Sequence, residues 1–187
     1  MNRGMAKTQL LRLTSIGIFA ALSLVMLLVI PGIPFPPAPF LKYDMADVPI
    51  IVASLLYGPV AGVVILVIVS AIQAFGIIGD GIIGFFMHVV ASSVLLLIPS
   101  LIHRRRPGKL AMFVGLGLGA VGMAVAMIFF NLLITPLYTG LERQVIVGML
   151  PPIVLFNLMK GGLNAAIAGL VTLALRPLIH SFVRRTL

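Results

Sequence analysis

Residues 31–49 read PGIPFPPAPFLKYDMADVP, a long stretch that is neither apolar enough to span a bilayer nor basic enough for a cytoplasmic tail. Five prolines fall in its first half: Pro31, Pro34, Pro36, Pro37 and Pro39. They exclude a regular helix there, because proline lacks an N–H and restricts the residue before it. Phe40, Lys42, Tyr43 and Asp44 follow. Between two apolar runs, the stretch is either a stiff lid over a pocket or a plain extracellular connector.

The composition defines the class of protein. Of the 187 residues, 61% are hydrophobic and only 9% are charged, whereas a soluble domain carries about 25% charged residues. We therefore expect an all-α, polytopic integral membrane protein with one transmembrane domain over residues 1–187. The net charge of +9 sits in short segments beside apolar spans, which favours membrane topology over nucleic-acid binding. The absence of cysteine excludes disulfides, thiolate metal sites and thiol catalysis, and we expect no metal site.

Six helices are predicted from the apolar runs and their breaks. Their approximate bounds are 9–30, 45–57, 60–75, 82–102, 110–134 and 150–179. The second is too short to span a bilayer upright, so it should be buried in the bundle or shallowly inserted. Asp44 is expected as its N-cap and Asp47 as an acid in its first turn.

The basic residues predict the orientation. Ten of them lie beside helix ends that would share one side: Arg3, Lys7, Arg12, Arg104, Arg105, Arg106, Lys109, Arg176, Arg184 and Arg185. Positive residues favour the cytoplasmic side, so both termini are predicted to be cytoplasmic. Lys42, Arg143 and Lys160 are the exceptions.

Lys160 lies inside an apolar helix, where an ionisable group is by default a functional candidate. Asn157, Lys160 and Asn164 are spaced i, i+3 and i+7 and share one helix face. With Asn131 they could line a polar pocket beneath residues 31–49. Alternatively, Lys160 snorkels or pairs with Asp44, and the asparagines join helices; for Asn164 we favour that second role.

Other residues narrow the function. Gly17 and Ala21 form a small-xxx-small pair, which allows either internal packing or the docking of a partner helix. The lone membrane histidine His88 is better explained by packing or capping than by catalysis. The chain has no GxxxxGK[ST] motif for ATP, and no catalytic constellation at membrane depth. We therefore expect no enzymatic activity.

The run PFLKYDMADVP, residues 39–49, and the junction GPVAG, residues 58–62, resemble the substrate-binding (S) subunits of energy-coupling-factor (ECF) vitamin transporters, above all the riboflavin-specific ones. The resemblance covers nearly the whole chain. Asn131, Asn157 and Lys160 resemble that family's polar flavin ligands. Gly17 and Ala21 resemble its AxxxA docking face, with glycine in place of the first alanine.

The resemblance implies a membrane subunit that captures riboflavin outside the cell and delivers it inward. Its partners would be a transmembrane coupling subunit and two ATP-binding subunits, in a bacterial or archaeal cell membrane. Riboflavin would be a transported ligand, and no cofactor is expected. The implied ligand set is Phe40, Leu41, Lys42, Tyr43, Asp44, Asn131, Asn157 and Lys160. Aromatic and apolar walls with a few edge donors suit such a ring.

Two alternatives remain open. The first is an S subunit for another vitamin or for FMN, and an FMN site should show two or more basic groups near the pocket. The second is a small membrane enzyme acting on lipid headgroups at the inner face. That enzyme would need histidine or acidic residues near the basic loops; His103 stands there without an acid.

Overall fold

The computed structural model describes the backbone of residues 3–30 and 32–186, and the side chains of residues 9–30, 32–137 and 139–177. The side chains of Arg3, Lys7, Arg184 and Arg185, which we used for the orientation, lie outside this part. The elements in chain order are α1 (Arg3–Val29), β1 (Ile33–Phe35), β2 (Ala38–Tyr43), α2 (Asp47–Tyr57), α3 (Pro59–Ile72), the π-helical η1 (Gln73–Ile77), α4 (Gly81–Arg105), α5 (Lys109–Thr139) and α6 (Arg143–Thr186).

Five helices are long and apolar enough to cross a membrane, and α2 is the short one among the described residues. Of the two alternatives for this short helix, the structure shows the first: α2 is buried in the bundle, where it contacts α1, α3, α4 and α6. Ile50, Ile51, Leu95 and Leu96 are buried in the core around it. With 11 residues α2 is too short to span a bilayer upright, and the neighbouring helices cover it instead of lipid.

Several helix ends differ from the prediction. Helix α5 continues to Thr139 instead of ending near residue 134, and α6 begins at Arg143 rather than near residue 150. Pro136 and Pro151 lie inside these helices. Membrane helices tolerate interior proline because neighbouring groups and small local adjustments satisfy the freed backbone.

The proline-rich stretch forms a β-hairpin, which the sequence analysis did not predict. Strands β1 and β2 pair antiparallel, with Ile33 opposite Tyr43 and an irregularity between Pro34 and Phe35. A two-stranded ribbon has only edge strands, and edge strands accept proline. The expected all-α class is therefore corrected to a mostly helical fold with one small sheet.

The start of α2 also differs from the prediction. The helix begins at Asp47 after an N-cap position at Ala46, without a side-chain cap. Asp44 instead accepts a hydrogen bond from the Ala46 N–H at 3.1 Å, two residues on. This local turn is typical of aspartate. Asp47 does lie in the first turn, as expected.

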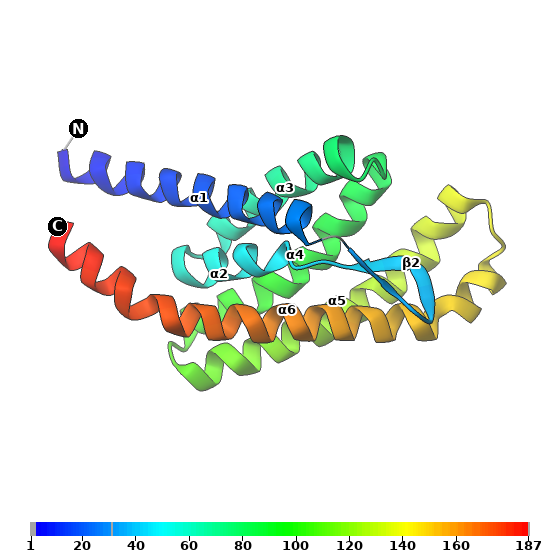
Figure 1. The fold of residues 1–187 in the computed structure, drawn as a ribbon. Helices are drawn as coiled ribbons and strands as arrows, with labels where there is room; N and C mark the ends of the chain where they lie inside the picture. The colour runs from blue at the N-terminus through cyan, green and yellow to red at the C-terminus, as the bar shows by residue number, and fades with distance from the viewer. Residues whose placement is uncertain (1–2, 31, 187) are drawn as a thin grey trace.

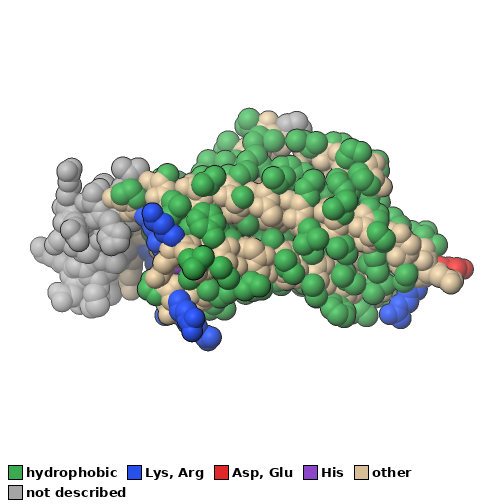
Figure 2. Space-filling view, turned by 90° about the horizontal axis from the view of Figure 1, so that it is seen from below, with side chains coloured by type: hydrophobic (Ala, Val, Ile, Leu, Met, Phe, Trp, Pro, Cys, Tyr) green, Lys and Arg blue, Asp and Glu red, His purple; other side chains and the backbone are tan. Residues whose placement is uncertain are grey.

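The bundle has two chemically distinct ends. Both ends of the described chain lie at one end, and the hairpin lies at the other, against α6 (Figure 1). In the space-filling view the flank is covered by hydrophobic side chains, while Lys and Arg gather at the ends (Figure 2). The structure therefore supports a protein with several membrane-spanning helices.

Candidate ligand site beneath the hairpin

An ion pair joins the end of the hairpin to α6. The Lys160 Nζ lies 2.7 Å from Asp44 Oδ2 and 3.8 Å from Asp47 Oδ2. All three side chains are buried: Lys160 is 8% exposed, Asp44 6% and Asp47 1%. Of the sequence-based possibilities, pairing with Asp44 is the contact that the structure contains. Burial makes this charge expensive unless it is paired, so the hairpin end and α6 depend on each other.

Asn164 fastens the same hairpin end through two hydrogen bonds. The Tyr43 hydroxyl donates to Asn164 Oδ1 at 2.9 Å, and Asn164 Nδ2 donates to the Asp44 carbonyl at 3.2 Å. Asn164 thus joins the hairpin to a helix, rather than one helix to another. Burial and the neighbouring Asp44 carboxylate raise the pKa of the Tyr43 phenol. It therefore stays neutral at physiological pH and can donate its proton.

A second polar chain runs from Asp47 across the bundle. Asp47 Oδ1 accepts a hydrogen bond from Ser92 Oγ at 2.7 Å and contacts His88 Nε2 at 3.1 Å. His88 Nδ1 lies 2.9 Å from Ser70 Oγ. Because a carboxylate only accepts, Nε2 carries the proton, and His88 on α4 links Asp47 of α2 to Ser70 of α3. The sequence analysis did not predict that Asp47 joins this polar chain. An acidic residue in a short apolar helix was the feature that could have indicated it.

An apolar cluster lies beside these polar groups. Phe35 and Phe156 are 5.7 Å apart between ring centroids and bury Ala38 with them, and Leu41 and Tyr43 pack against this group. Side chains alternate between the two faces of a strand. Accordingly, the neighbouring strand residues on the opposite face are exposed: Phe40 and Lys42. Phe40 and Tyr43, which both belong to the implied ligand set, therefore lie on opposite faces of β2.

The two remaining predicted ligands are buried on α5 and α6. Asn131 Nδ2 donates to the Met127 carbonyl and Asn157 Nδ2 to the Ile153 carbonyl, each at 2.8 Å. Both side-chain amides are thus bonded to the backbone of their own helix.

The predicted docking residues lie on the surface of α1. A Cβ built on Gly17 would meet nothing within 4 Å, and Ala21 is also exposed.

This arrangement can bind a ligand but offers no evident covalent chemistry. It combines donors and acceptors (Tyr43, Asp44, Lys160, Asn164) with an aromatic wall, as small-molecule sites generally do. Among the described residues, no group of three His, Cys, Asp or Glu side chains could hold a metal ion.

A polytopic helical bundle with a buried polar cluster under a hairpin defines a membrane protein with a candidate ligand site. Comparison with known families specifies it further. The family described as "ECF transporter, substrate-specific component" matches residues 11–172. The chain belongs to this family, which confirms the resemblance seen in the sequence. Members are components of transporters and not enzymes, and their ligand is a transported substrate, not a cofactor.

Curated relatives and a solved structure agree. The chain is 30% identical to "Riboflavin transporter FmnP" of Bacillus subtilis (strain 168), over 84% of this chain and 89% of that protein. It is 26% identical to "Riboflavin transporter RibU" of Staphylococcus aureus (strain TCH60), over 80% and 82%. A structure entitled "Structure and mechanism of the S component of a bacterial ECF transporter" superposes with a TM-score of 0.74 at 24% identity. It covers 94% of this chain and 98% of that one, which supports the fold.

Proposed function

We propose that this chain is the riboflavin-specific S component of an ECF transporter. It would take the vitamin from outside the cell and release it inward when coupled to an energising module. The observation that carries this proposal is the similarity, over most of the chain, to two relatives named riboflavin transporters. The site beneath the hairpin supports it, because polar and aromatic groups meet there.

The chemistry of riboflavin suits the site. Its ring system has an apolar edge and an edge of carbonyl and N–H groups, and its side chain carries hydroxyls. Leu41, Tyr43 and the ring of Phe156 would cover the apolar part. The Lys160 ammonium has three donors, and its contacts with Asp44 and Asp47 leave it able to turn one toward a ligand carbonyl.

The other proposed ligand-binding residues would contact riboflavin in two different ways. Asn131 and Asn157 are buried and polar and would contact the ring edge after small side-chain turns. Phe40 and Lys42 are exposed in this structure, so they would contact the ligand only if the hairpin closes over it. The hairpin would act as the lid.

The choice of riboflavin over FMN follows from charge. FMN carries a phosphate dianion, which calls for two or more cations. Among the described residues near the site, Lys160 is the buried cation and is already paired with Asp44, while Arg143 is exposed at the start of α6.

The proposed orientation places the hairpin outside and both termini in the cytoplasm of a bacterial or archaeal cell. The end of α4 and the start of α5, which carry Arg104–106 and Lys109, lie at the same end of the bundle as the termini (Figure 1), as positive residues do on the inner side. Arg12 contacts the Tyr57 carbonyl at the end of α2. A transmembrane coupling subunit and two ATP-binding subunits on other chains would dock from that side.

Fluorescence titration of the purified chain in detergent tests the ligand. We expect riboflavin fluorescence to be quenched when protein and riboflavin are present in equal amounts. FMN should bind at least about tenfold more weakly, because its phosphate would lack one charged partner. Unrelated vitamins such as thiamine and biotin should not compete. Displacement of riboflavin by one of them, or an absence of quenching, would contradict the proposal.

Variants make the same titration more specific. Asn157→Leu should weaken binding by about tenfold, because a buried ligand acceptor loses its donor. Arg143→Met, which also removes one polar group from α6, should bind normally because Arg143 is exposed. Tyr43→Phe loses the bond to Asn164 and should mainly release the ligand faster. If all three variants bind and release riboflavin as the unchanged chain does, the site assignment is wrong, although riboflavin can still be the ligand.

The α1 surface should be needed for transport but not for binding. Gly17→Leu and Ala21→Leu are expected to reduce uptake into cells by about tenfold or more, since bulky residues prevent close approach of a partner helix. Riboflavin binding by the isolated chain should survive, because the space beside Gly17 is open. Gly117→Leu is the matched control on α5, where the space is also open. Normal uptake by both α1 variants would show that the partner docks elsewhere.

A further inference from the structure

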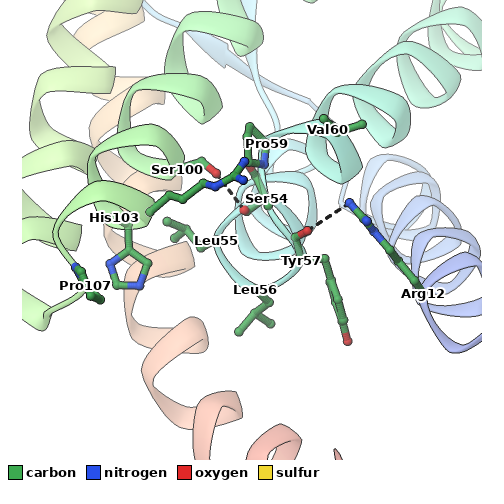
Figure 3. Close-up of a pocket in the computed structure, with 12 residues that line it drawn as sticks. Arg12, Ser54, Leu55, Leu56, Tyr57, Pro59, Val60, Ser100, His103 and Pro107 are labelled. Carbon is green, nitrogen blue, oxygen red and sulfur yellow. Dashed lines mark hydrogen bonds between the residues drawn. The ribbon is translucent and has the colours of Figure 1, made fainter. Parts of the chain in front are cut away.

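A pocket lies at the opposite end of the bundle from the hairpin. Its volume is about 620 Å³, and it opens between α1, the α2–α3 junction and the end of α4 (Figure 3). The residues that carry its chemistry are Arg12, Tyr57, Ser100, His103 and Arg104. It shares no residue with the site beneath the hairpin, so the proposed riboflavin function does not use it.

The pocket is positively charged. Arg12 donates to the Tyr57 carbonyl at 3.3 Å, which leaves most of its five N–H donors available. The second guanidinium, of Arg104, is exposed. None of the chain's four acidic residues lines the pocket. A site with two cations and no counter-charge favours an anion.

His103 contributes a buried polar side chain to the pocket wall. Its side chain lines the pocket and is 8% exposed. Its Nε2 contacts the guanidinium of Arg176; because a guanidinium only donates, Nε2 must accept, and the ring proton is assigned to Nδ1. The Gly108 backbone is the hydrogen-bonding group beside the ring. His103 lies next to Pro107, on the opposite side of the pocket from Arg12 (Figure 3), so it closes one wall of the pocket.

The position of the pocket along the bundle indicates which molecule would supply the anion. It lies at the end of the bundle that carries Arg104–106 and Lys109, where the apolar flank gives way to charge. The ring of Tyr57 packs edge-on against Phe19, and tyrosine is typical of the membrane–water interface. Val60 lines the pocket and is 66% exposed. One wall is thus continuous with the lipid-facing surface, along which an acyl chain could run.

We propose that this pocket binds the phosphate of an anionic phospholipid headgroup, held by the guanidinium groups of Arg12 and Arg104. Basic pockets between membrane helices on the inner side commonly recognise such headgroups. An acidic side chain of a protein partner would match the charge, but it would leave the apolar wall at Val60 unused.

The test uses the full chain, purified in detergent and stripped of lipid. Phosphatidylglycerol is expected to raise the midpoint of thermal unfolding by several degrees, whereas phosphatidylcholine and inorganic phosphate leave it near its starting value. Arg12→Gln and Arg104→Gln should each weaken phosphatidylglycerol binding by about tenfold, the effect of one charge-assisted hydrogen bond. Arg105→Gln and Arg106→Gln are matched controls, since they remove the same charge from α4 and its end without lining the pocket.

Native mass spectrometry gives a second measurement for any variant with low stability, by counting the phosphatidylglycerol molecules retained. We expect one retained lipid to be lost in the two pocket variants and kept in the two controls. An equal loss in all four variants would overturn the pocket in favour of diffuse surface charge. Equal stabilisation by inorganic phosphate would overturn the lipid as its source, and stabilisation by an acidic peptide but not by lipid would assign the pocket to a protein partner. None of these results depends on flavin.

Discussion

Lys160→Met is expected to lower the free energy of unfolding by roughly 3–5 kcal/mol, because it leaves a buried charge without its partner. Asp44 Oδ2 would lose a contact of 2.7 Å, and Asp47 Oδ2, which has no hydrogen bond within the described residues, would lose the nearest cation. Riboflavin binding should fall below detection. Equilibrium unfolding in detergent measures the first effect, and fluorescence titration measures the second.

The double variant Asp44→Asn/Lys160→Met separates stability from binding. With both charges gone, most of the lost stability should return, as it does when buried ion pairs are replaced as a unit. An asparagine at position 44 can still accept from the Ala46 N–H, and Asp47 keeps Ser92 and His88. If Lys160 also binds the ligand, riboflavin affinity stays low. Recovery of both stability and affinity would show that the ion pair is purely structural.

The second large effect is expected where α4 and α5 touch. A Cβ on Gly119 would lie 2.8 Å from the Leu95 carbonyl oxygen and 3.1 Å from Pro99 Cδ. The first neighbour is backbone and cannot turn away, so Gly119→Ala should force the helices apart and cost about 1–3 kcal/mol. This exceeds the gain of up to about 1 kcal/mol that alanine brings to a helix.

Gly117→Ala is the control for this substitution, since a Cβ there meets nothing within 4 Å. It should be neutral or slightly stabilising. The difference in unfolding free energy between the two variants therefore reports the helix contact alone. Equal stability would mean that α4 and α5 can separate at little cost, and that the close approach is not needed.

The sequence predicted part of the site because some signals are local. A lysine inside an apolar helix stands out without a structure, and the i, i+3, i+7 spacing predicts which residues share its face. Position along one helix, however, does not say where a side chain bonds. Asn131 and Asn157 share the burial expected of them, yet each donates to its own helix, and Asn164 binds the hairpin instead.

The membrane class, the six helices and the shortness of the second helix follow from the sequence, because hydrophobic length and charge position act locally along the chain. The burial of that helix and the hairpin are visible only in the fold, since the prolines that exclude a helix are compatible with edge strands. The sequence offered Asp44 as one of several alternatives for Lys160, and the structure selects it and adds Asp47, both more than a hundred residues away. A buried charge must find its partner in space, and sequence spacing does not record which partner that is.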